Sequence, residues 1–539
     1  MGEAGQGPRT DLEALRRGVE SGEVSRREFL RRAGALGLSL AAAASLLDAG
    51  GRVAAAQATP GAGGAEPSGT LVIANAEPPT SAQWDAYSVF GLVDAQVASL
   101  VHDSLLGYDS ADAEIVGHIA SEWEVTSPTT VRLTLREGVR FHDGSPVTAD
   151  DVKATIDRVG NPESGLAWHG LIFPAGGATV VDERTVEVFT EEPFGPLEKS
   201  LAVMPIFPAG DIADPELFKQ RAMGAGPYRF VSYEQNKVTV EANPDYWAGS
   251  PKIQTVVLDY IQDANARISA LLSGQADIIT RTSAEQLARV ADDPNFYVVD
   301  VPPLTQIVYI YQNKGNLAAK EVRQAIAHAV DREAIVEGIL QGVGKVPYSS
   351  IATTAPGYQE QAERFAYDPA RARELLSSAG FEDNLTLTMA TTTLVPFQKE
   401  IDQAVVQFLG DVGVTVDLTT LEVGAFRTSY NQYDMTLNTL ASFNFDPDFV
   451  LGFYGGPTAE AVFGLDDPNI PPLIEAQRAA QGEERLAAIN DLAAYLWDLQ
   501  PALYLSDELW PFIVSSRVKD YARVPVVGEP LLRFASKEE

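Results

Sequence analysis

The chain of 539 residues contains no cysteine and only five histidines. Without cysteine there can be no disulfide bond, no thiol nucleophile, no cysteine-ligated zinc and no membrane anchor through a lipid-modified cysteine. The histidines are scattered, and even His142, which stands beside Asp143, has no further histidine at the spacing of a metal ligand. We therefore expect neither a metal ion nor another cofactor.

Positive charge is also scarce, since 40 lysines and arginines stand against 74 aspartates and glutamates and give a formal net charge of −34. A field of this sign repels nucleic acid and anionic lipid, so we expect neither as a partner. With 45% hydrophobic and 21% charged residues, the composition is that of a globular protein. A chain of this length is expected to form two or more domains.

Signatures of catalysis are missing as well, because the sequence contains neither H-E-x-x-H nor G-x-S-x-G. The segment before Lys345 is similar to a phosphate-binding loop, but it has Ile339 where that loop needs glycine and Val346 where it needs serine or threonine. The sequence thus predicts a protein that is not an enzyme. A hydrolase acting in a cleft is the alternative, and it would be recognised by two carboxylates that face each other with shifted pKa values.

The N-terminal region has the order of features of an export signal. Residues 25–31 are close to the twin-arginine pattern S-R-R-x-F-L-K, with Arg26, Arg27 and Phe29 at its defining positions. The apolar run over 33–47 is too short for a stable membrane span. We expect the twin-arginine translocase to be a partner during export, and the protein to work in the periplasm or at the extracellular face of the cytoplasmic membrane.

The predicted signal peptide covers residues 1–56 and ends in Ala54-Ala55-Ala56, small residues that suit a cleavage site. The sequence leaves open whether it is cleaved after Ala56 or kept as an anchor. Residues 57–68 are rich in glycine, alanine and proline without an apolar period, and they predict a flexible linker.

The stretch 224–279 carries the clearest structural signal of the chain. Apolar residues alternate over 228–242, which predicts paired strands, and the nearly continuous apolar run 255–261 predicts a buried strand. Asp263 is placed to cap a helix that leads to the next strand near Asp277. A strand, a helix and a strand predict a parallel pair, and such a lobe leaves a ligand crevice at its strand ends.

The runs GPYRFVSY, NPDYW and ARISALLSGQADI within this stretch resemble family 5 of the extracellular solute-binding proteins, which serve ABC importers. Three further blocks, 119–155, 322–342 and 367–381, resemble the same family in the same order. The resemblance implies a periplasmic-binding-protein-like α/β fold in which a hinge, near 303–311 and 500–506, joins two α/β lobes and a third domain is inserted. It divides the chain as follows: lobe I at 69–113, 215–310 and 505–535; inserted domain II at 114–214; lobe II at 311–504.

The resemblance also implies the function. The protein would be a monomer that captures a small solute and delivers it to an ABC import permease and its ATPase. Peptides are the commonest solutes of the family and are our first expectation. An oligosaccharide or another solute that is not a peptide is the alternative.

By the same resemblance, ligand contacts are expected from the passage 439–453 and from aromatic residues after the first strand. Peptide-binding relatives hold the ammonium of the peptide with an aspartate where this chain has Phe443, so a free-amine peptide would need Asp446 as a substitute. The Asp446-Pro447-Asp448 step also fits a helix N-terminus, which we prefer for Asp448 and leave open for Asp446. The candidate ligand-binding residues are Trp84, Tyr87, Leu440, Ser442, Phe443, Asn444, Phe445 and Asp446.

Overall fold

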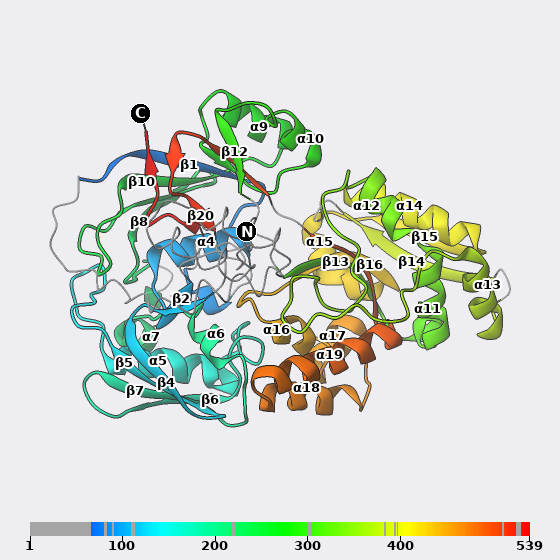
Figure 1. Cartoon of the computed structure of the whole chain (residues 1–539), viewed down its shortest axis with the longest axis horizontal. Coiled ribbons are helices and arrows are strands. Elements are labelled where there is room, and N and C mark those ends of the chain that lie inside the picture. Colours follow the sequence, from blue (N-terminus) through cyan, green and yellow to red (C-terminus); the bar gives the residue numbers. More distant parts are fainter. Residues whose placement is uncertain are drawn as a thin grey trace, which may run out of the picture. The chain divides into compact units, whose positions relative to one another are not determined.

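The computed structural model (Figure 1) describes most of the chain after the predicted signal peptide and linker. The predicted signal peptide and most of the predicted linker lie outside the described residues. No helix of the described part is long and apolar enough to cross a membrane. The described residues are 66–79, 84–88, 91–108, 114–214, 216–217, 221–299, 304–381, 384–392, 395, 397–508, 511–523 and 530–538.

A seven-stranded sheet is built from strands near both ends of the described part and from the stretch 228–299. Its strand order is β12-β18-β11-β1-β10-β9-β8. β1 is parallel to its two neighbours β10 and β11, and it lies between them. The strands are β1 (Ser68–Asn75), β8 (Tyr228–Glu234), β9 (Lys237–Ala242), β10 (Ile253–Tyr260), β11 (Ile278–Ile279), β12 (Phe296–Val299) and β18 (Phe512–Ser515).

The predicted unit of strand, helix and strand is present as β10, α9 (Ala264–Leu272) and β11. Asp263 caps the helix, because its carboxylate accepts a hydrogen bond from the backbone of Ala266 at 2.7 Å. The two strands are parallel, but they are not neighbours, since β1 separates them. Nothing local in the sequence indicates that a strand from about 180 residues earlier takes this place.

A four-stranded antiparallel sheet of order β4-β5-β7-β6 occupies the region between β3 and β8 in the sequence. Helix α5 (Ala149–Gly160) packs against β6 and β7. Thr148 and Asp151 begin this helix as a capping box. The strands are β4 (Ala120–Ser127), β5 (Thr130–Leu135), β6 (Gly176–Val180) and β7 (Thr185–Thr190).

A five-stranded sheet of order β15-β14-β16-β13-β17 forms the other large α/β part. Figure 1 shows it among helices α11 to α14 and α19. Its strands are β13 (Thr305–Tyr311), β14 (Leu385–Thr391), β15 (Val414–Thr420), β16 (Met435–Ala441) and β17 (Ala502–Asp507). The helices are α11 (Lys320–Ala329), α12 (Arg332–Gly338), α13 (Pro369–Ser378), α14 (Gln398–Asp411) and α19 (Gly482–Leu499).

Shorter elements complete the described part. They are β2 (Leu106–Tyr108) with β3 (Ile115–Gly117), α4 (Leu92–Val101), α6 (Leu197–Leu201), α7 (Ala209–Ala213), α10 (Ala284–Ala288), α15 (Val423–Ser429), α16 (Pro447–Gly452), α17 (Gly456–Phe463), α18 (Ile470–Ala479), β19 (Val518–Lys519) with β22 (Ser536–Lys537), and β20 (Ala522–Arg523) with β21 (Pro530–Leu531).

The chain passes between the two large sheets twice, from β12 to β13 and from β17 to β18. We predicted that lobe I reaches residue 310 and resumes at residue 505. Instead, β13 and β17 pair with each other in the five-stranded sheet over Gln306–Ile310 and Ala502–Asp507, so these residues belong to the second lobe's sheet. Both strands are buried along their whole length and are largely apolar, and such a pattern does not tell to which sheet a strand belongs. The rest of the division into lobes stays a prediction.

Asp402 on α14 is a buried acid of the second lobe, and it accepts a hydrogen bond from the hydroxyl of Tyr309 at 2.6 Å. Burial raises the pKa of Asp402 to about 6. The folded protein therefore binds a proton more tightly than the unfolded chain, and stability falls as the pH rises from 4 through 6.

In the unchanged protein, Asp402 should lower the free energy of unfolding by about 3 kcal/mol between pH 4 and pH 7. We expect Asp402→Asn to remove this contribution to the pH dependence. Urea unfolding of both proteins at each pH measures it. Asp417→Asn, at an exposed site of β15, is the control. Parallel stability curves for Asp402→Asn and the unchanged protein would refute the expectation.

Candidate functional site

A cleft of about 640 Å³ lies between the seven-stranded sheet and the second lobe. One wall follows the carboxyl ends of three parallel strands, with Glu77 after β1, Tyr260 at the end of β10 and Arg281 after β11. The other wall includes Phe397 and Arg427. Its volume is in the range of small-ligand sites, and the ends of parallel strands are where open α/β sheets bind ligands.

The strand-end wall is polar and its charges are largely satisfied within the protein. Arg281 forms an ion pair with Glu77. The buried guanidinium of Arg267 donates hydrogen bonds from one nitrogen to the carbonyls of Ile261 and Gln262, at 2.9 and 2.8 Å. Burial lowers the pKa of Arg267. This wall can offer hydrogen bonds to a ligand from groups that the fold already holds in place.

The wall of the second lobe is mainly apolar. It also contains the exposed Arg427 on α15 and the buried Glu508 directly after β17. Its apolar members come from a strand, a helix and three loops or helix ends, and they are Ile307, Leu340, Val343, Phe397 and Val423.

The predicted ligand passage around residue 444 is instead a buried turn that the protein satisfies by itself. The Ser442 hydroxyl lies 2.8 Å from the Asp446 carbonyl and 3.2 Å from the side-chain oxygen of Asn444. The Asn444 carbonyl accepts a hydrogen bond from the Tyr108 hydroxyl at 3.0 Å, and its amide donates to Ser200 at 3.4 Å. Ser442, Asn444 and Asp446 are fully buried. Through Tyr108 and Ser200, the turn is hydrogen-bonded to the N-terminal half of the chain.

Asp446 is the most firmly held residue of this turn. Its carboxylate accepts two hydrogen bonds from Arg485, at 2.6 and 2.9 Å, and lies 3.2 Å from the ammonium of Lys199. Burial alone would raise its pKa, but the charges of Arg485 and Lys199 outweigh it and lower the pKa to about 2. Asp446 also caps α16, with Asp448 in the first turn as predicted. It is therefore not available as a partner for the ammonium of a ligand.

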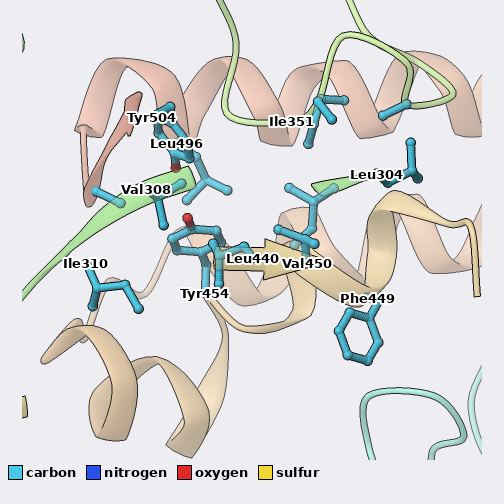
Figure 2. Packing of buried hydrophobic residues seen from close by; sticks show 14 of the residues in the cluster. Leu304, Val308, Ile310, Ile351, Leu440, Phe449, Val450, Tyr454, Leu496 and Tyr504 are labelled. Carbon is cyan, nitrogen blue, oxygen red and sulfur yellow. The ribbon is translucent and has the colours of Figure 1, made fainter. Parts of the chain in front are cut away.

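Leu440 points into the buried core of the second lobe, as Figure 2 shows, among residues such as Val308, Val450 and Tyr454. It is 7% exposed. Leu440 does not line the cleft described above, because β16 is the central strand of its sheet and has buried side chains on both faces, Leu437 on one and Leu440 on the other.

The two aromatic candidates of the N-terminal part also pack within the protein. The half-buried Trp84 lies on Phe230, with ring centroids 4.7 Å apart. Tyr87 is fully buried and its hydroxyl donates a hydrogen bond to the Pro205 carbonyl. The structure does not bring them together with the cleft walls described above.

Phe443 and Phe445 are half-buried. Phe443 lines a smaller cavity of about 90 Å³ beside His102 and Trp168. Lys199 lies over the ring of Phe445 at 5.9 Å and donates a hydrogen bond to its carbonyl at 3.0 Å. A cavity of 90 Å³ holds a few waters and is too small for a peptide.

The cleft residues Glu77, Tyr260, Arg281, Phe397 and Arg427 were not among the predicted ligand contacts. The rule that ligands bind at the ends of parallel strands could have indicated the first three, since each stands at or just beyond such an end. Phe397 and Arg427 belong to the opposite wall, and no local pattern marks them.

The arrangement does not match that of a cleft hydrolase. Glu77 and Glu508 are the carboxylates of the described cleft lining, and Glu77 is paired with Arg281. Asp402 and Asp507, whose pKa burial raises to about 6, do not line this cleft. Within the described ranges, no group of histidines and acids could hold a metal ion.

Comparison with known proteins agrees with the family that the sequence resembles. The family described as bacterial extracellular solute-binding proteins, family 5 Middle, matches residues 114–461. The chain is 27% identical over 492 residues to the glutathione-binding protein GsiB of Pectobacterium atrosepticum, which covers 84% of this chain and 90% of the relative.

Solved structures agree in fold. The dipeptide-binding protein of Pseudoalteromonas sp. SM9913, in complex with Met-Leu, has a TM-score of 0.78 at 20% identity and covers 87% of this chain and 100% of its own. The binding protein AgaA of A. tumefaciens R10, in complex with agropinic acid, has a TM-score of 0.76 at 25% identity and covers 87% and 99%. The predicted mixed α/β fold of periplasmic binding proteins is thereby confirmed.

Proposed function

Because the chain belongs to family 5 of the bacterial extracellular solute-binding proteins, which are binding components of ABC importers and not enzymes, we propose that it captures a peptide in the cleft between its two large sheets. The observation that carries this proposal is the cleft itself, about 640 Å³ at the carboxyl ends of β1, β10 and β11. Its polar wall suits a peptide backbone, and its apolar wall suits side chains.

Solutes other than peptides are the second candidate. The relative AgaA is in complex with agropinic acid, and GsiB binds glutathione. The buried ion pair of Asp446 with Arg485 favours this candidate over a free-amine peptide, since the expected partner of the ammonium is already occupied.

We expect solute binding to draw the two large α/β parts together about the two connections between the sheets. A ligand that touches both walls stabilises the closed state more than the open one. The closed form would then be the one that the permease and its ATPase recognise.

A melting screen tests binding without turnover. A ligand at 100 times its dissociation constant adds about 2.7 kcal/mol to the free energy of unfolding. We expect at least one compound among peptides, glutathione, agropinic acid and oligosaccharides to raise the melting temperature. Mass spectrometry should then recover that compound intact. Recovery of cleaved products at enzyme-like rates would instead support a hydrolase.

Export by the twin-arginine route remains our proposal, supported by Arg26, Arg27 and Phe29 in the sequence. Replacing both arginines by lysine should leave the full-length precursor in the cytoplasm, as cell fractionation and immunoblotting would show. Arg31→Lys, just outside the pair, is the control and should be exported normally. Unchanged export of the double variant would count against this route.

A further inference from the structure

We propose that the cleft binds an organic acid with an apolar body, and that Arg427 receives its carboxylate. This inference rests on the proposed function and adds the class of solute. It starts from a contrast of charge: the described cleft lining has three arginines and two glutamates, whereas the whole chain has 40 basic and 74 acidic residues. The cleft therefore has a different balance of charge from the rest of this acidic protein.

Four of these five charges have a role within the protein. Glu77 and Arg281 form an ion pair. Arg267 is buried and donates to two backbone carbonyls. Glu508 is buried, and it interacts with another group of the protein.

Arg427 differs from the other four. It is exposed on the cleft wall, and it has no ion pair with any described residue. An arginine presents a planar fork of donors that matches a carboxylate with two parallel hydrogen bonds. A single unpaired guanidinium compensates one negative charge, which suits a carboxylate better than a phosphate dianion, because an uncompensated charge in a closing cleft is costly.

The surroundings of Arg427 define the rest of the solute. Val423 lies one helical turn away on α15, and Phe397, Leu340 and Val343 line the same wall. An apolar group next to the carboxylate would be removed from water against these side chains when the cleft closes. The polar strand-end wall offers hydrogen bonds to the remaining groups of the solute. N-blocked apolar peptides and acylated amino acids have this combination.

The test uses N-acetyl-Leu-Leu as the acid and its C-terminal amide as the matched neutral probe, with calorimetric titration of the full protein. The acid should bind at least about tenfold more tightly than the amide. Arg427→Gln should weaken the acid about tenfold and leave the amide unchanged, and Arg427→Lys should weaken it less. Arg289→Gln, at an exposed arginine that is not part of the cleft lining, should change neither affinity.

Other results would overturn the proposal. Equal affinity for the acid and the amide, or an unchanged affinity of Arg427→Gln for the acid, would show that Arg427 does not receive a carboxylate. If the acid fails to bind while neutral solutes of the melting screen bind, the class of solute is wrong and the binding function stands. If no compound binds in either experiment, both the inference and the proposed function fail.

Discussion

Replacing Asp446 by alanine is expected to lower the free energy of unfolding by about 3–5 kcal/mol, because it leaves the buried Arg485 without its partner. The Arg485 guanidinium donates two hydrogen bonds to this carboxylate, and Lys199 lies 3.2 Å away from it. Asp446 is 0% exposed, so water cannot replace the lost contacts. The variant would also lose the N-cap of α16.

The contribution of Asp446 to the free energy of unfolding should decrease as the pH falls. Its pKa is lowered to about 2, below the value near 3.9 of an unfolded aspartate. The carboxylate therefore stabilises the fold above about pH 4, and this contribution disappears as the pH falls from 4 through 2. Urea unfolding at pH 7 and at lower pH measures it.

The control is Asp417→Ala, at an exposed position of β15, which should change the free energy of unfolding by no more than about 0.5 kcal/mol. Equal and small losses for both variants would contradict the assignment of Asp446 to a buried ion pair. If instead Asp446→Ala folds normally and loses only solute binding, the original expectation that Asp446 holds a ligand would be restored.

Leu440→Ala has the second large expected effect, a loss of about 2–5 kcal/mol through the cavity that the truncation leaves in the core. Leu440 is 7% exposed and packs among the buried residues in Figure 2. Thermal unfolding with and without a bound solute separates stability from affinity. We expect a lower melting temperature and an unchanged dissociation constant for the fraction that remains folded.

Leu418→Ala is the matched control, since Leu418 on the edge strand β15 is 38% exposed and its truncation leaves little cavity. A Leu440→Ala protein that is as stable as this control but binds its solute more weakly would place Leu440 in the ligand site.

Local features of the fold were predictable because they depend on neighbouring residues. Asp263, Asp331 and Asp368 each accept a hydrogen bond from a backbone amide three residues later and begin a helix. Periodicity alone likewise predicts the paired strands β4 and β5.

Contacts between residues that are far apart in the sequence could not be predicted from local patterns. Asp446 finds Arg485 and Lys199 at 39 and 247 positions along the chain. A short Asp-Pro-Asp sequence does not show whether its first acid faces a ligand or a buried arginine. The insertion of β1 between β10 and β11 is a similar case.

The residues of the cleft could likewise be predicted only in part from the sequence. Its strand-end wall follows from a general rule about parallel sheets, whereas its second wall is assembled from five separate apolar positions, Arg427 and Glu508. These residues come together only when the second lobe has folded, so the sequence resemblance could suggest a binding protein without identifying the residues that meet the solute.

The central claim is that a solute is held in the cleft between the two large sheets. A crystal structure of the protein with the solute found by the melting screen tests this claim most directly. We predict electron density for the intact solute between Tyr260 and Arg281 on one wall and Phe397 and Arg427 on the other. Density for the solute at another place, such as the small cavity beside Phe443 and His102, would contradict it.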